Sequence, residues 1–266
     1  MSVIYAMSDI HGCYPAMKQA LAGVHLKTTD QLIFVGDYVD GGPNSFQVLS
    51  EIMTLERNNP GQIVTLLGNH DEWLCNWLFP KDDAEGRQAT IVDFKTVTSF
   101  FNEVELQRMA QALQLTEHTP RVLDDLLREK LLQNGRAEKV LSWLKQKMTA
   151  QRYYELENQI FVHAGIDEET GHFWKQGTLN STFTEKFPAT KGSFFKDIVS
   201  GHIHSEEVAN DSTYLGAVYW DGDSHFFVDG HTDTSGIVPI LKYDTETGHY
   251  TAFKRSENGW EAYRLK

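Results

Sequence analysis

The chain has 266 residues, of which 41% are hydrophobic and 23% charged, and a formal net charge of -13. This composition is ordinary for a globular protein, and the length is enough to bury a substantial core. No apolar run approaches the roughly 20 residues of a membrane span. The acidic balance, without a basic patch carrying interleaved aromatic residues, argues against a nucleic-acid partner.

The first third of the chain alternates short apolar runs with segments of helical spacing. Strands are predicted at Val3–Met7, Leu32–Val35 and Ile63–Leu67, with helices at Pro15–Val24 and Ser45–Leu55 between them. Short strands separated by helices are typical of a mostly parallel sheet with helices on its faces. We therefore expect an α/β fold.

A different pattern follows from about Glu72 to Thr149. Segments such as VLDDLLREKLLQN and AEKVLSWLKQKM repeat apolar residues at three- and four-residue intervals, with charged residues between them. This spacing predicts a helical cap or insertion at about residues 72–150. Because no repeat or Pro/Ser-rich linker divides the chain, we expect one domain over residues 1–266.

Strand character returns after the insertion. Strands are predicted at Gln159–Val162 and Ile198–Ser200. The tail alternates apolar and polar residues in a way that suits antiparallel strands, at Tyr214–Trp220, His225–Val228, Val238–Tyr243 and Tyr250–Lys254. The Asp-Gly pairs at Asp221 and Asp229 are expected to form turns.

Five polar clusters each follow a predicted strand. They are Asp9-Ile10-His11-Gly12, Gly36-Asp37-Tyr38-Val39-Asp40, Gly68-Asn69-His70-Asp71, His163-Ala164-Gly165 and Gly201-His202-Ile203-His204. One such cluster alone is best explained as a turn. Five together are hard to explain in that way, because loops at the carboxyl ends of strands converge to form sites. The adjacent glycines allow the backbone to approach an ion or phosphate closely.

The side chains of these clusters are those of a metal centre. Carboxylate, imidazole and amide oxygen suit Mn²⁺, Fe or Zn²⁺ better than a soft thiolate site does. We expect two divalent ions, with Mn²⁺ as the first choice, bridged by the carboxylate of Asp37 at the tip of the central strand. Such ions would concentrate positive charge locally in an acidic protein.

The order of the motifs, D-x-H, GD-x-x-D, GNH-D, HAG and GH-x-H, resembles the calcineurin-like metallophosphoesterases. More narrowly, it resembles their phosphoprotein-phosphatase branch, which includes bacterial Ser/Thr phosphatases and diadenosine tetraphosphate hydrolases. The match runs from Asp9 to His204. The resemblance implies an α+β sandwich of two mixed sheets flanked by helices, in four layers.

The resemblance also implies roles for individual residues. The first metal would be held by Asp9, His11 and Asp37, and the second by Asp37, Asn69, His163 and His202. His70 would be the general acid, and Asp40 would orient and charge it. A hydroxide bridging the two metals would attack phosphorus in line. For His204, ligation of the first metal and a polar role outside the ligand set both remain open.

Two departures from the branch concern phosphate binding. The usual GD-x-V-D-R-G motif has an arginine where this chain has Gly41, and a second arginine expected after the HAG motif is missing. The basic residues in that region are Lys175, Lys186 and Lys191, and lysine lacks the fork geometry of arginine. We therefore expect weaker binding of phosphate monoesters than in a typical member.

The leading hypothesis is a Ser/Thr protein phosphatase-like enzyme that acts on a phosphorylated protein or a small phosphate ester. The alternative is a diadenosine tetraphosphate hydrolase. Asp71 in GNHD, where GNHE is common, and the long insertion favour this alternative slightly. Trp73 after that motif could stack a nucleobase, although core packing is commoner. A catalytically weak module that binds phosphorylated ligands is disfavoured, because all the presumed ligands are present.

The setting of the protein is inferred from the N-terminus and the cysteines. MSVIYAMSDIHG lacks the basic stretch and long apolar core of a signal peptide. Cys13 and Cys75 do not make a disulfide framework. We expect a cytoplasmic protein with no membrane association. The oligomeric state is left open by the sequence.

Overall fold

The computed structural model describes residues 2–80, 93–114, 120–256 and 259–266. One sheet has the strand order β11-β10-β9-β1-β2-β3. It consists of β1 (Val3–Met7), β2 (Gln31–Phe34), β3 (Ile63–Thr65), β9 (Ile240–Asp244), β10 (Tyr250–Ser256) and β11 (Gly259–Arg264). The first three strands are parallel, and the last three are antiparallel additions at one side. The sheet is therefore mixed.

The second sheet has the order β4-β5-β6-β8-β7. Its strands are β4 (Tyr153–Glu155), β5 (Gln159–Val162), β6 (Asp197–Ser200), β7 (Tyr219–Trp220) and β8 (His225–Phe227). Here β5, β6 and β8 run parallel, while β4 and β7 pair antiparallel at the two edges. This sheet is also mixed, as expected from the resemblance.

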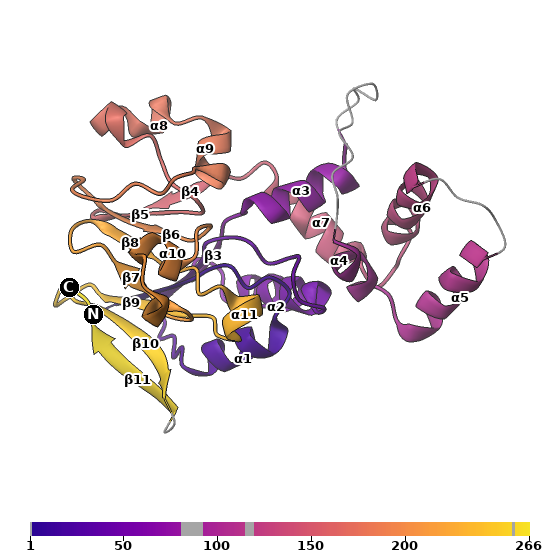
Figure 1. Ribbon diagram of the computed structural model, residues 1–266, viewed down its shortest axis with the longest axis horizontal. Helices are drawn as coiled ribbons and strands as arrows, with labels where there is room; N and C mark the ends of the chain where they lie inside the picture. The colour runs from indigo at the N-terminus through magenta and orange to yellow at the C-terminus, as the bar shows by residue number, and fades with distance from the viewer. Residues whose placement is uncertain (1, 81–92, 115–119, 257–258) are drawn as a thin grey trace.

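Helices flank both sheets (Figure 1). Before the second sheet the chain forms α1 (Tyr14–Ala22), α2 (Ser45–Asn58), α3 (Asn69–Leu78), α4 (Phe94–Ser99), α5 (Glu103–Gln114), α6 (Pro120–Leu132) and α7 (Glu138–Lys147). Later come η1 (Glu168–Phe173), α8 (Trp174–Gly177), α9 (Asn180–Glu185), α10 (Ser205–Ala209), η2 (Ser212–Tyr214) and α11 (Thr232–Ser235). None of the helices in the described ranges has the length and apolar character needed to cross a bilayer.

Alternation along the strands builds the four layers. In β1, Ile4 and Ala6 belong to a cluster that also holds Phe161 and Val199 of the second sheet, so these side chains fill the space between the sheets. Tyr5 of β1 belongs instead to the cluster under α1 and α2. The outer face of the second sheet packs on α8 and α9, through residues Ile160, Val162, Ile198, Trp174 and Phe183. The expected four-layer architecture is confirmed.

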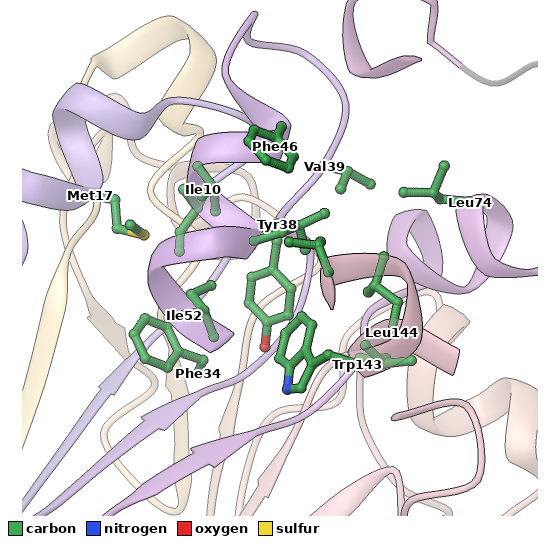
Figure 2. Close-up of a cluster of buried hydrophobic side chains, with 14 of the residues drawn as sticks. Ile10, Met17, Phe34, Tyr38, Val39, Phe46, Ile52, Leu74, Trp143 and Leu144 are labelled. Atoms are coloured by element: carbon green, nitrogen blue, oxygen red, sulfur yellow. The ribbon is translucent and has the colours of Figure 1, made fainter. Parts of the chain in front are cut away.

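The helix-side core also receives α7 from the predicted insertion. Trp143 and Leu144 of α7 are buried with Tyr38 and Ile52 in one cluster, as Figure 2 shows. The indole of Trp143 donates to Glu56 Oε2 of α2 at 2.7 Å. In contrast, α5 and α6 lie farthest from the sheets (Figure 1). The insertion is helical where it is described; its residues 81–92 and 115–119 lie outside the described ranges.

The tail differs from the sequence expectation in two respects. The predicted strand Tyr214–Trp220 is only β7, preceded by the short helix η2. The strand at His225 pairs parallel with β6, where an antiparallel tail was expected, and all three of its residues are buried. A strand covered on both faces shows no alternation, so its pattern could not reveal its direction. The strands β4 and β11 were not predicted.

Candidate metal centre

The predicted site residues lie beyond the carboxyl ends of five strands from both sheets. Asp9 and His11 follow β1, Asp37 and Asp40 follow β2, Asn69 and His70 begin α3 after β3, His163 follows β5, and His202 and His204 follow β6. Because β1, β2 and β3 are parallel, as are β5 and β6, their carboxyl ends meet along one edge of the sandwich.

Asp37 is shared by two groups of side chains that could each hold a metal ion. One group contains His11, Asp37 and His70, and the other contains Asp37, His163 and His202. Within each group, one ligand atom of every residue lies within 4.8 Å of the others. A carboxylate common to both groups has the position required of a bridging ligand.

Asp9 and Asn69 lie beside these groups. The carboxylate of Asp9 lies 3.8 Å from His11 Nε2. Asn69 Oδ1 lies 3.0 Å from both His163 Nε2 and His202 Nδ1. Carboxylate, imidazole and amide oxygen therefore converge from segments far apart in sequence.

Backbone carbonyls orient two of the imidazoles. His11 Nδ1 lies 3.0 Å from the carbonyl of Val39, and His163 Nδ1 lies 3.1 Å from that of Val35. A carbonyl can only accept, so each Nδ1 carries a proton and donates it. This leaves Nε2 of both rings directed at the carboxylates, which is the tautomer that a metal ligand requires.

The backbone of the site is tightly constrained. Five site residues have left-handed φ angles between 47° and 69°, namely Asp9, His11, Asp37, Asp40 and His202. Non-glycine residues in this region cost of order 1–3 kcal/mol each and concentrate at functional sites. A Cβ on Gly68 would lie 2.1 Å from Asp37 Oδ1, and one on Gly201 would lie 1.9 Å from Asp9 Oδ2. Glycine at these positions allows the loops to come this close.

The electrostatics of the cluster favour a cation. Burial, followed by the carboxylate of Asp229, raises the pKa of Asp9 well above 3.8. Burial opposes a charge on His163, but the carboxylates of Asp37 and Asp9 outweigh it and raise its pKa to about 10. Buried carboxylates thus draw a positive charge into the cluster. A divalent ion bound here would take the place of the second proton of His163.

His70 and Asp40 form a separate pair beside the cluster. His70 Nδ1 lies 2.7 Å from Asp40 Oδ2. Burial lowers the pKa of His70, but the hydrogen bond to Asp40 and the charge of Asp37 outweigh burial and raise it. The pair is partly exposed, with 29% of the His70 side chain and 15% of the Asp40 side chain accessible. A protonated imidazole can therefore meet a substrate here.

His204 belongs to neither of the two groups, and its contacts in the structure are to Asp229 and His231. Its Nδ1 is 3.0 Å from Asp229 Oδ2, and its ring stacks on that of His231 with centroids 3.7 Å apart. Asp229 is buried and also accepts the backbone N–H of His231 at 2.8 Å. Sequence reasoning treated Asp229 only as a turn residue. Its place directly after a strand, like that of the other site carboxylates, was the available signal.

The three lysines after the HAG motif are engaged elsewhere. Lys186 donates to the carbonyl of Ile166 at 2.7 Å, and Lys191 donates to that of Val208 at 3.2 Å. Lys175 pairs with Glu155. Beside Gly41, where the branch has an arginine, Lys95 of α4 donates to the carbonyl of Gly41 at 2.9 Å. Sequence reasoning did not identify this residue.

A sequence profile described as calcineurin-like phosphoesterase matches residues 2–206. A symmetrical bis(5'-nucleosyl)-tetraphosphatase of Nitrosococcus oceani is 41% identical over 69 residues, which are 26% of this chain and 23% of the relative. The alignment thus spans less than a third of that relative's length.

Two solved structures share the fold at low identity. A cold-active protein-tyrosine phosphatase of a Shewanella species has a TM-score of 0.53 and 14% identity, covering 99% of this chain and 80% of the other. A protein serine/threonine phosphatase from Saccharomyces cerevisiae has a TM-score of 0.52 and 11% identity, covering 100% and 80%.

Proposed function

The chain belongs to the calcineurin-like phosphoesterase family, and we propose that it is a two-metal phosphatase that hydrolyses phosphate monoesters in the manner of Ser/Thr protein phosphatases. The observation that carries this proposal is the shared position of Asp37 in two ligand groups, with the pair of His70 and Asp40 beside them. A binuclear centre next to a general acid is an arrangement that supports hydrolysis of a phosphate ester.

We assign the metal ligands by their positions. Asp9, His11 and Asp37 would hold one ion, and Asp37, Asn69, His163 and His202 the other. His204 is proposed to reach the first ion with Nε2 while Asp229 holds its Nδ1. Two divalent ions, with Mn²⁺ as our first choice, would act as Lewis acids and supply a nucleophile from water at neutral pH.

The protein's own side chains contribute a proton to the reaction, held on Nε2 of His70. Asp40 holds the Nδ1 proton of His70, which leaves the Nε2 proton for the leaving oxygen of the substrate. As the P–O bond breaks, the leaving oxygen takes that proton and departs as an alcohol. Asp40 keeps the imidazole oriented throughout and stabilises its protonated form.

A second candidate function is the hydrolysis of diadenosine tetraphosphate. The tetraphosphatase name of the Nitrosococcus relative supports it, and so does the position of Trp73. The ring of Trp73 lies 4.6 Å from that of His70, and the residue is 38% exposed. An aromatic face beside the general acid could stack a nucleobase.

We also propose that residues 1–266 form one domain, because α7 of the insertion packs in the same core as α2. Cys13 and Cys75 are both free thiols, which supports a reducing, cytoplasmic setting.

The deciding experiment compares a phosphoserine/phosphothreonine peptide with diadenosine tetraphosphate, with Mn²⁺ added. Phosphate release reports on the peptide, and nucleotide chromatography reports on the dinucleotide, because symmetrical cleavage releases no phosphate. His70→Asn tests for contaminating activity. His249→Asn is the matched control, since His249 is exposed in the β9–β10 turn.

Higher activity on the peptide would support the phosphatase proposal, provided that His70→Asn abolishes this activity and His249→Asn retains it. Preference for the dinucleotide would support the second candidate. Activity on neither substrate, in protein shown to contain metal, would contradict both.

A further inference from the structure

Helix α4 of the insertion and the preceding Asp93 contact the turn that carries Asp40. Asp93 Oδ2 accepts the backbone N–H of Gly41 at 3.0 Å, and Lys95 donates to the carbonyl of Gly41 at 2.9 Å. Thr96 of α4 bonds to Asp40 itself. These contacts join segments 52 to 56 residues apart. The Asp40–Gly41 turn is therefore held by the insertion as well as by its own loop.

Thr96 makes two hydrogen bonds to Asp40. Its hydroxyl donates to Asp40 Oδ1 at 2.8 Å and accepts the backbone N–H of Asp40 at 2.9 Å. Ser45 Oγ lies 3.1 Å from the same hydroxyl. A hydroxyl has one proton to donate and two lone pairs to accept with. Because Thr96 gives its proton to Asp40, Ser45 must donate, and the hydroxyl of Thr96 is fully satisfied.

The two carboxylate oxygens of Asp40 have different partners. Oδ1 accepts from Thr96, and Oδ2 faces His70 Nδ1 at 2.7 Å. The backbone of Asp40 has a φ of 69°, a strained conformation for a residue with a side chain. The bond from the Asp40 N–H to Thr96 stabilises this conformation. Thr96 has no exposed surface, so its hydroxyl is shielded from water.

We propose that Thr96 is a positioning residue for the general acid: it fixes Asp40 so that Asp40 orients His70. The inference rests on the proposed phosphatase function and extends it, because it makes the helical insertion part of the catalytic apparatus. The hydroxyl of Thr96 bonds to Asp40 and Ser45, neither of which is a proposed metal ligand. Its effect passes through Asp40 to the proton on His70 Nε2.

The test uses two substrates that differ in their need for that proton. The alkoxide that leaves a phosphoserine peptide requires protonation, whereas the nitrophenolate that leaves p-nitrophenyl phosphate departs without it. Thr96→Val should lower kcat on the peptide by about 30-fold and change kcat on p-nitrophenyl phosphate by no more than about 3-fold. Thr96→Ser, which keeps the hydroxyl, should restore the peptide activity.

The matched control is Thr98→Val in the same helix. The Thr98 hydroxyl donates to the carbonyl of Phe94 at 2.8 Å and takes no part in the contacts to Asp40. The Thr98→Val variant should leave the ratio of the activities on the peptide and on p-nitrophenyl phosphate unchanged. A double-mutant cycle with Asp40→Asn adds a second measurement, because Thr96→Val should cause no further loss once Asp40 has been neutralised. If Thr96→Val does not fold, Thr96→Ala is measured in its place.

Equal losses on both substrates, or additive losses in the cycle, would overturn the inference while leaving the phosphatase proposal intact. Wild-type protein inactive on both substrates would instead contradict the proposed function. The two failures are therefore distinguishable.

Discussion

The carboxylate of Asp71 accepts the backbone N–H of Asp37 at a distance of 2.8 Å. The same carboxylate accepts the N–H of Tyr38 at 2.9 Å and that of Gly68 at 3.0 Å. Asp71 is fully buried at the start of α3. It thus joins the loop after β2 to the loop after β3, and it holds the backbone of the proposed bridging ligand in its left-handed conformation.

Replacing Asp71 by asparagine should weaken both the fold and the metal centre. An amide has one oxygen, so at least one of the three buried N–H groups would face an NH₂ group and remain unsatisfied. We expect the free energy of unfolding to fall by about 2–3 kcal/mol, with weaker Mn²⁺ binding. Urea unfolding and metal titration measure these effects. Asp211→Asn, at an exposed turn, is the control. Unchanged stability in Asp71→Asn would refute the argument.

Much of the sandwich could be predicted from the chain itself. The strand Val3–Met7 and the strand Gln159–Val162 were predicted with the bounds they have, because each is an apolar run with clear polar limits. The direction of the strand at His225 could not be predicted, because burial on both faces hides the alternation. The strand Tyr153–Glu155 is only partly buried and has no apolar run to reveal it.

In the candidate site, too, some residues could be predicted from the sequence and others could not. The candidate ligands could be picked out because they stand in short motifs after strands, and folding brings these motifs together. Asp71 stood within such a motif, yet its role depends on three backbone N–H groups brought to it by folding. Thr96 could not be found at all, because its partner Asp40 is 56 residues away and threonine in a helix carries no chemical signature.

Trp73 should discriminate between the two candidate substrates. Its ring lies against His70, and its Nε1 donates to Glu185 Oε1 at 3.2 Å. If it stacks a base, Trp73→Ala should reduce kcat/KM for diadenosine tetraphosphate about 10-fold or more, with a smaller loss on a phosphopeptide. Trp73→Phe keeps an aromatic face and should retain most of the dinucleotide activity. Similar losses on both substrates would indicate that Trp73 only supports His70.

Lys95 should bind the phosphate group of the substrate. Its ammonium lies beside Gly41, where a Cβ would be 3.4 Å from His11 Cβ. Gly41 itself has a φ of 76°, so an arginine there would be strained. We expect Lys95→Gln to raise KM for a phosphate monoester about 5- to 10-fold and to change kcat little. Lys139→Gln, on the exposed side of α7, makes the same charge change. Equal KM values in the two variants would rule out this role.

A pH-dependent contribution to stability is expected from His225, away from the metal centre. The side chain is buried, and its Nε2 lies 3.1 Å from Glu168 Oε2. Its Nδ1 lies 2.9 Å from the carbonyl of Gly192 and 3.2 Å from Asp221 Oδ2. Both ring nitrogens face acceptors, so the doubly protonated imidazolium fits best.

The direction of the pH effect follows from the two pKa shifts. Burial lowers the pKa of His225, but the hydrogen bond and charge of Glu168 outweigh burial and raise it above 6.5. Burial raises the pKa of Glu168, but the hydrogen bonds from His225 and Lys186 outweigh it and hold the pKa below 4.5. The histidine's contribution is complete below 6.5 and is lost as the pH rises through its raised pKa. That of the glutamate is complete above 4.5 and is lost as the pH falls through its lowered pKa.

Replacing His225 by glutamine should therefore lower the free energy of unfolding most between about pH 4.5 and pH 6.5. We expect a loss of about 2 kcal/mol in the free energy of unfolding at pH 6, because Glu168 loses its hydrogen bond from His225 and is left with the one from Lys186. The difference between wild type and variant should narrow as the pH rises through the raised pKa of His225 and the wild-type side chain loses its proton. Urea unfolding of both proteins at pH 6 and pH 9 measures this difference directly. A difference that stays constant or widens towards pH 9 would mean that His225 is buried as a neutral ring.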